Sequence, residues 1–102
     1  MDVDLADLAA HASEAEALLK GLSNSNRLMV LCALSDGELS VTELNERIPL
    51  SQSALSQHLA TLRKAGMVAT RRESQTIYYR LDDPKVSIII EALHGMFCGA
   101  LA

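Results

Sequence analysis

The sequence predicts a small, mainly α-helical domain with one β-hairpin and a helix-turn-helix at its centre. Three observations support this fold class. Apolar residues recur at three- and four-residue steps over most of the chain, and the period changes to two between residues 67 and 81. Near residue 50, only the tripeptide PLS separates two short helical stretches, which is the arrangement of a helix-turn-helix. We expect residues 1–102 to form one domain.

The first two helices are predicted over residues 3–20 and 25–35. Acidic residues early in the first helix suit its positive end, and Gly21 follows its apolar stripe as a stop. Asn24 can cap the second helix, and Asp36-Gly37 closes it.

The helix-turn-helix is predicted from residue 40 to residue 65. Ser40 and Glu43 have the spacing of a capping box, which begins a short helix that ends before Pro49. Ser51 can cap the next helix, and Gly66 is expected to end it.

A β-hairpin and a last helix complete the fold. Residues 67–73 and 76–81 are rich in strand-forming side chains and flank Ser74-Gln75, so they are predicted to pair. The last helix is predicted over residues 84–101, with Pro84 in its first turn. It is apolar on most sides, so it needs cover on two sides, and a second subunit is the natural second cover.

The charge is unevenly distributed. The net charge of −4 combines −6 over residues 1–50, +4 over residues 51–80 and −2 over the remainder. A basic segment inside an acidic chain indicates where an electrostatic partner binds, although a solvated basic face explains the charge alone equally well.

The helix predicted over residues 51–65 carries the candidate DNA-reading surface. Its leucines share one side, and uncharged hydrogen-bonding side chains occupy the other. Gln can bridge the edge of adenine, and Ser and Thr can bond base edges or phosphates. These candidates for contact with double-stranded DNA are Gln52, Ser53, Ser56, Gln57 and Thr61 on the helix, Arg63 and Lys64 at its end, and Arg71, Arg72 and Arg80 on the hairpin. A solvated helix face explains the polar residues, but not their occurrence together with the turn, the hairpin and the basic segment.

His58 has two interpretations. It lies beside the leucine stripe, where it is either a half-buried imidazole bonded to a neighbouring carbonyl or a contact to phosphate or base. Catalysis is not expected, because no Ser/Asp or Cys partner stands near it in the sequence.

The stretches GLSNSNRLMVLCAL, GELSVTEL, LSQSALSQHLATLRKAGMV and IYYRL occur in the order found in winged-helix repressors. In these stretches, over most of residues 20–101, the chain resembles the ArsR/SmtB family. The resemblance implies a winged helix-turn-helix of order ααααββα, with the hairpin as the wing, and a homodimer through the first and last helices. It also implies an imperfect palindromic operator, release by an inducer, and DNA contact by positions 52, 53, 56, 57 and 58.

Metal sites of that family are not expected here. Where one family site has a Cys-x-Cys pair, this chain has Ser40 and Thr42, and hydroxyls do not replace thiolates for soft metals. For a second family site, only Asp83 is present, and the other three positions hold Lys85, Met96 and Gly99. We predict no metal site and no cofactor.

Cys32 and Cys98 are the only cysteines, and they lie on helices expected to pack together. Isolated cysteines are usually small buried hydrophobes. The pair nevertheless resembles that of the redox-sensing and reactive-sulfur-sensing branch of the family, in which equivalent cysteines form a disulfide or a sulfur bridge. His94, four residues before Cys98, either assists the thiol by charge or proton transfer or only packs. A partial zinc site of Cys32, His94 and Cys98 is the minority interpretation.

These observations predict a cytoplasmic, homodimeric repressor that releases operator DNA when an oxidant or reactive sulfur species links Cys32 to Cys98. No apolar run is long enough for a membrane span or a secretory signal, and no cofactor loop or oxyanion arrangement indicates an enzyme. The alternatives are a zinc-responsive repressor, a non-sensing antirepressor or activator of the same fold, and a dimeric protein-interaction module that does not bind DNA.

Overall fold

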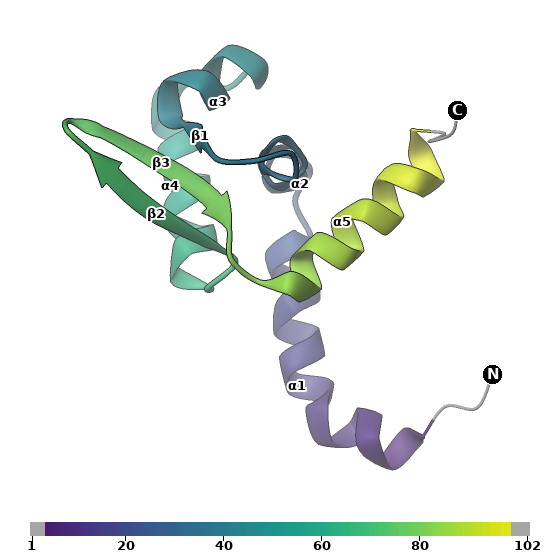
Figure 1. Cartoon of the computed structure of the whole chain (residues 1–102). Coiled ribbons are helices and arrows are strands. Elements are labelled where there is room, and N and C mark those ends of the chain that lie inside the picture. The colour runs from purple at the N-terminus through teal and green to yellow at the C-terminus, as the bar shows by residue number, and fades with distance from the viewer. Residues whose placement is uncertain (1–3, 99–102) are drawn as a thin grey trace.

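The computed structural model describes residues 4–98, which form five helices and three strands (Figure 1). In chain order the elements are α1 (Leu5–Leu22), α2 (Ser25–Leu34), β1 (Leu39–Ser40), α3 (Val41–Arg47), α4 (Gln52–Lys64), β2 (Val68–Glu73), β3 (Thr76–Leu81) and α5 (Pro84–Phe97). The predicted helix-turn-helix is α3 and α4, and the predicted hairpin is β2 and β3. The winged helix-turn-helix prediction is confirmed.

The helix starts follow the capping rules read from the sequence. The Asn24 side chain accepts from the Arg27 N–H at the start of α2, and the Ser51 hydroxyl accepts from the Ala54 N–H at the start of α4. Ser40 and Glu43 form the predicted capping box at α3. Each cap satisfies backbone donors that have no partner within the helix.

The prediction that Gly21 ends the first helix is wrong: α1 includes Gly21 and ends at Leu22. Gly21 lies so close to the Met67 side chain that a Cβ atom there would collide with it, so this glycine permits a close approach. The helix end is instead capped by the Arg27 guanidinium, whose Nε donates to the Gly21 carbonyl at 2.8 Å.

The strand β1 was not predicted. Its two residues pair with β3, Leu39 opposite Tyr79 and Ser40 opposite Tyr78, which gives an antiparallel sheet in the order β1-β3-β2. A strand of two residues is too short to show a period of two in the sequence.

The hairpin turn at Ser74-Gln75 forms without glycine or asparagine. Ser74 adopts a φ of 59°, the left-handed conformation that a tight two-residue hairpin turn requires. Opposite residues include Arg71 with Tyr78 and Ala69 with Arg80, so these four side chains share one face of the sheet.

The core lies between α2, α3, α4, α5 and the root of the wing. Its fully buried side chains include the predicted leucine stripe of α4, and they are Val30, Leu31, Leu44, Leu55, Leu59, Leu62 and Val86. Because Leu55, Leu59 and Leu62 face the core, the opposite face of α4 is turned toward solvent.

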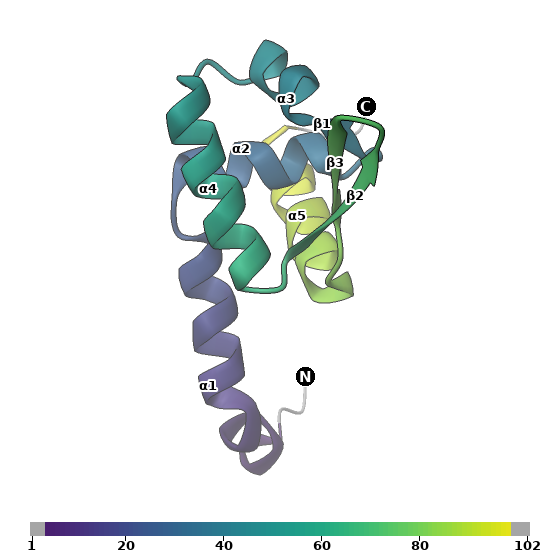
Figure 2. The same ribbon diagram turned by 90° about the vertical axis from the view of Figure 1, so that its left-hand side faces the viewer.

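Two helices extend away from this core (Figures 1 and 2). On α1 only Leu22 is buried, and on α5 only Val86 and Ile90 are buried. Large apolar side chains on these helices remain exposed: Leu5, Leu8, Leu19, Ile88, Met96 and Phe97. The predicted last helix ends at Phe97, and residues 99–101 of that prediction lie outside the described part of the chain. Among residues 4–98, no helix combines the length and apolarity needed to cross a membrane.

Candidate nucleic-acid interface and dithiol site

The turn before α4 is held by a specific hydrogen bond. The Asn45 side-chain amide of α3 donates to the Leu50 carbonyl at 2.8 Å, and Ser51 then caps α4. The core-facing side of α4 carries the buried leucines Leu55, Leu59 and Leu62. The start of α4 is therefore fixed by the cap and the turn, and its rotation is fixed by the core.

The exposed face of α4 brings together the residues predicted to read DNA. Gln52, Ser53, Ser56 and Gln57 line one shallow hollow with Ala60. Thr61 is exposed beyond them, and its hydroxyl donates to the Gln57 carbonyl at 3.1 Å. The hollow presents uncharged donors and acceptors, which suit base edges and phosphate oxygens.

His58 is half-buried at the edge of this face, and no hydrogen bond to its ring is found among residues 4–98. Arg63 and Lys64 are exposed in the last turn of α4, where cations also stabilise the negative helix end. These two side chains continue the polar face toward the wing.

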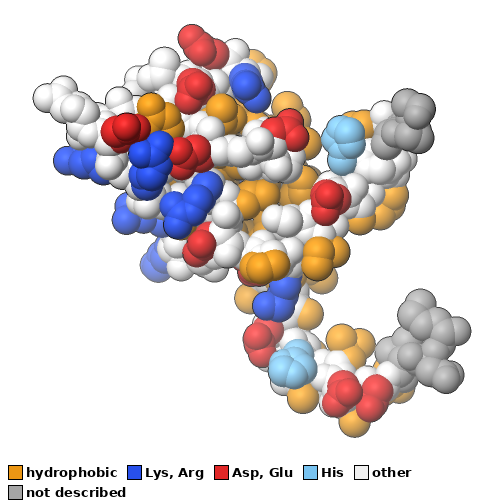
Figure 3. All heavy atoms as spheres, viewed as in Figure 1, with side chains coloured by type: hydrophobic (Ala, Val, Ile, Leu, Met, Phe, Trp, Pro, Cys, Tyr) orange, Lys and Arg blue, Asp and Glu red, His pale blue; other side chains and the backbone are white. Residues whose placement is uncertain are grey.

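Lys and Arg side chains gather over the hairpin and α4 (Figure 3). Arg72 and Arg80 are exposed on β2 and β3. Because side chains alternate along a strand, Arg72 lies on the opposite face of the sheet from Arg71 and Arg80. The wing therefore presents cations on both of its faces.

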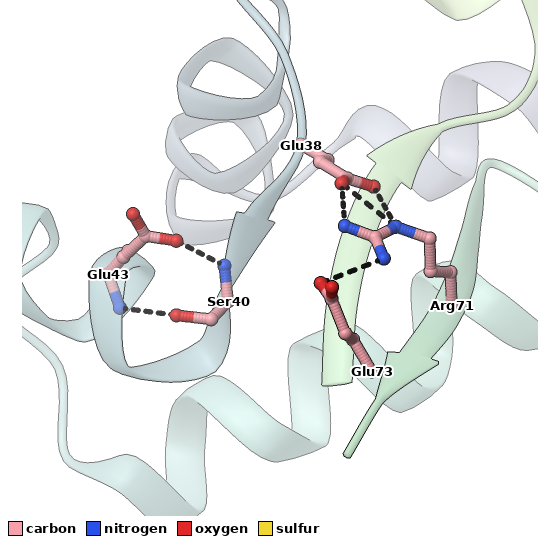
Figure 4. Close-up of polar contacts among 5 residues, drawn as sticks. All are labelled: Glu38, Ser40, Glu43, Arg71 and Glu73. Atoms are coloured by element: carbon pink, nitrogen blue, oxygen red, sulfur yellow. Dashed lines mark hydrogen bonds and ion pairs between the residues drawn. The ribbon is translucent and has the colours of Figure 1, made fainter. Parts of the chain in front are cut away.

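Arg71 differs from the other wing cations because carboxylates hold it (Figure 4). Its Nε lies 2.9 Å from Glu38 Oε1, and its Nη1 lies 3.1 Å from Glu73 Oε2. The hydrogen bond from Arg71 lowers the pKa of Glu38, and the bonds to Glu38 and Glu73 raise the pKa of the guanidinium further above its usual range. Glu38 was not predicted as a partner of Arg71, because the two residues are 33 positions apart and no local pattern links them.

The two cysteines are free and lie at different depths. Cys32 on α2 is half-buried against the core, while Cys98 is exposed and ends α5, its N–H donating to the His94 carbonyl at 2.8 Å. Cys32 and His94 line a cleft of about 470 Å³ between α2 and α5. Asp36 and Glu91 line the same cleft, and Cys98 lies one turn beyond its His94 edge.

Ser40, which stands where one family site has a cysteine ligand, has a structural role here. The Ser40 hydroxyl accepts from the Glu43 N–H at 3.1 Å as the cap of α3. Within residues 4–98, no group of three or more His, Cys, Asp and Glu side chains is placed to hold a metal ion.

Comparison with known proteins gives consistent matches along the chain. Residues 24–70 match the model of the bacterial regulatory protein arsR family. The transcriptional activator HlyU of Vibrio cholerae serotype O1 is 49% identical over 98 residues, which cover 96% of this chain and 91% of that protein.

Solved structures agree with the sequence matches. Reduced HlyU from Vibrio cholerae N16961 is 50% identical with a TM-score of 0.85, covering 90% of this chain and 97% of that chain. The transcriptional repressor BigR from Xylella fastidiosa is 43% identical with a TM-score of 0.89, covering 94% of this chain and 98% of that chain.

Proposed function

This chain belongs to the arsR family of bacterial regulatory proteins and is a transcriptional regulator, and we propose that it acts as a homodimeric repressor switched by its two cysteines. In this proposal the reduced dimer holds an imperfect palindromic operator in double-stranded DNA. An oxidant or a reactive sulfur species then links Cys32 to Cys98, and the operator is released.

The observation that carries the DNA-binding part is the composition of one surface. The exposed face of α4 offers amides and hydroxyls, and exposed arginines flank it on the wing, although the whole chain has a net charge of −4. In a helix-turn-helix dimer two such faces enter successive major grooves about 34–36 Å apart. The exposed apolar side chains of α1 and α5 supply the surface for pairing two copies.

The cleft between α2 and α5 supports the switch. Disulfide formation removes two protons and two electrons from the two thiols, and a peroxide that accepts them is reduced to water. A polysulfide can instead act as both oxidant and sulfur donor: the thiolates attack its S–S bonds, one or more of its sulfur atoms stay between the cysteines, and the remainder leaves as hydrosulfide and a shorter polysulfide that carry the two electrons and the two thiol protons. Such a bridge relaxes the Cα separation of roughly 7 Å that a direct disulfide allows. Either link draws the end of α5 toward α2, and α5 carries part of the apolar surface assigned to the dimer.

The similar proteins support a regulator that works in either direction. HlyU of Vibrio cholerae is named an activator and BigR of Xylella fastidiosa a repressor. We assign repression here because the α4 face and the wing suffice to occupy an operator. HlyU has also been solved in a reduced form, which supports a redox-dependent state in this chain.

Operator binding by cysteine variants tests the proposal. A duplex is first selected from a genomic fragment library at low ionic strength, and fluorescence anisotropy then measures its affinity for wild type, Cys32→Ser and Cys98→Ser. Before treatment all three should bind alike. After treatment with sodium tetrasulfide or peroxide, only the wild type should release the duplex. Release by either serine variant places the switch elsewhere.

Intact mass identifies the chemistry in the same samples. A loss of two hydrogens indicates a disulfide, a gain of whole sulfur atoms indicates a sulfur bridge, and bound zinc after treatment with zinc supports the metal-responsive alternative. If no duplex is preferred and binding does not depend on salt, the chain is a protein-interaction module, because neutralised phosphates must release counterions.

A further inference from the structure

The exposed side chain of Arg71 extends across the sheet. The strand order is β1-β3-β2, and Arg71 on β2 lies opposite Tyr78 on β3. Its guanidinium carbon stands 4.7 Å from the centre of the Tyr78 ring, and beyond that ring it meets Glu38, the residue before β1. One side chain therefore touches all three strands or their immediate ends.

Three of the five N–H groups of this guanidinium donate to carboxylates. Nε donates to both oxygens of Glu38, at 2.9 and 3.2 Å, and Nη2 donates to Oε1 of the same carboxylate. Nη1 donates to Glu73 at 3.1 Å. One cation between two carboxylates leaves a local charge of −1, which repels a phosphate, so Arg71 contributes little to the attraction of the wing for DNA.

The Glu38 end of this contact leads directly into the helix-turn-helix (Figure 4). Ser40, the last residue of β1, is also the N-cap of α3. The Ser40 N–H donates to Glu43 at 2.9 Å, and the Glu43 N–H donates to Ser40 at 3.1 Å. The chain from Glu38 to α3 is thus short and hydrogen-bonded, and a force on Glu38 is carried into α3.

Resting on the proposed DNA-binding function, we propose that Arg71 is a positioning residue that holds the wing against the helix-turn-helix through Glu38, and that it is not a phosphate contact. This ion pair between Arg71 and Glu38, called the tie below, sets the angle at which Arg72 and Arg80 approach the duplex. Arg72, the next residue on the same strand, is exposed and forms no ion pair among residues 4–98, so it is the matched control.

The salt dependence of DNA binding separates the two roles. A lost phosphate contact lowers the slope of log K against log salt by about 0.9, and Arg72→Ala should show this loss. Arg71→Ala should keep the wild-type slope and weaken binding about two- to fivefold, the range of an exposed ion pair. Arg71→Lys should behave like Arg71→Ala, because an ammonium does not reproduce the two-pronged contact with Glu38, whereas Arg72→Lys should retain most of its affinity.

Amide hydrogen exchange of the wing without DNA gives a second measurement. Arg71→Ala and Glu38→Ala should each speed exchange at residues 70–79 about two- to fivefold, and the double variant should be no faster, because the same tie is already broken. Arg72→Ala should leave this exchange unchanged.

Two results overturn the inference. One is a slope reduced by about 0.9 in Arg71→Ala with affinity retained in Arg71→Lys, which makes Arg71 a phosphate contact. The other is unchanged wing exchange in both Arg71→Ala and Glu38→Ala. If the wild type prefers no duplex, the proposed function fails, and the hydrogen exchange alone decides whether the tie holds the wing.

Discussion

Replacing Ile88 with alanine should weaken dimer formation and leave the fold of each protomer intact. Ile88 lies on α5 and is 65% exposed, so its side chain makes few contacts within its own chain. Phe97 on the same helix is 81% exposed. A dimer that forms through α1 and α5 removes this apolar surface from water.

The expected magnitude follows from these exposures. Full burial of a large apolar side chain stabilises by about 1.5–3 kcal/mol, so burying the exposed part of Ile88 contributes roughly 1–2 kcal/mol. A two-fold symmetric dimer contains the position twice, which gives roughly 2–4 kcal/mol. Since each 1.4 kcal/mol is about tenfold, Ile88→Ala should raise the dimer dissociation constant roughly 30- to 1000-fold.

Sedimentation velocity with fluorescence detection measures that constant on protein labelled at its N-terminal amine, which leaves the cysteines free. Met29→Ala is the control, because Met29 is 50% exposed but lies on α2, outside the two helices. Circular dichroism should be the same for both variants. A dissociation constant within twofold of wild type for Ile88→Ala, or a larger effect of Met29→Ala, refutes pairing through α5.

Three further outcomes are expected. Leu59 is buried on α4, and Leu59→Ala should lower the free energy of unfolding, measured in urea, by about 3–5 kcal/mol. Gln57 is on the exposed face of α4, and Gln57→Ala should change stability by less than about 0.5 kcal/mol and mainly lower DNA affinity. The hydrogen bond from Arg71 holds the pKa of Glu38 below the usual value of 4.5. The stabilisation from this pair is therefore complete above pH 4.5 and is lost as the pH falls through the pKa of Glu38 in the folded state. The melting temperature of Glu38→Gln should therefore fall less steeply than that of wild type below pH 4.5, with Glu46→Gln at an exposed position of α3 as control. Replacing His94 with asparagine should slow cross-linking of the cysteines by peroxide, followed by intact mass, without changing DNA affinity of the reduced protein, because His94 lines the cysteine cleft and lies outside the α4 face.

Local rules explain why much of the fold was predictable. The capping box at Ser40, the cap at Ser51 and the leucine stripe of α4 each depend on residues within one or two turns of one another. The same is true of the hairpin, where the alternation of side chains on β2 and β3 outweighed a turn without glycine. Contacts of this kind are encoded by spacing alone.

The tie between Arg71 and Glu38 was not predictable for the opposite reason. It depends on β1, which has two residues and exists only because β3 lies beside it. The sequence placed Arg71 and Arg72 in one basic group, whereas alternation along β2 puts them on opposite faces, and only one meets Glu38. Charge counted along the chain does not distinguish a paired cation from an unpaired one.

The position of His94 shows an intermediate case. Its four-residue spacing from Cys98 predicted one neighbour, but α5 ends at Phe97, and Cys98 departs from helical geometry with φ −105° and ψ 2°. The cleft adds a second neighbour, Cys32, which comes from the packing of α5 on α2. Helical spacing finds partners on one helix, and tertiary packing supplies the others.

The same packing gives the proposed switch a route to DNA. Helix α2 packs against α5 on the side of the cysteine cleft and also packs against α4. Its buried side chains, Val30, Leu31 and Leu34, belong to the same core as side chains of α4 and α5. A core packed at crystal density transmits displacement rather than absorbing it. A link that pulls the end of α5 toward α2 therefore acts both on the apolar surface proposed to form the dimer and on the core contacts that position α4. In the proposed dimer the two α4 helices meet grooves at a fixed separation, so a small rotation of α5 in each protomer would misplace one of them.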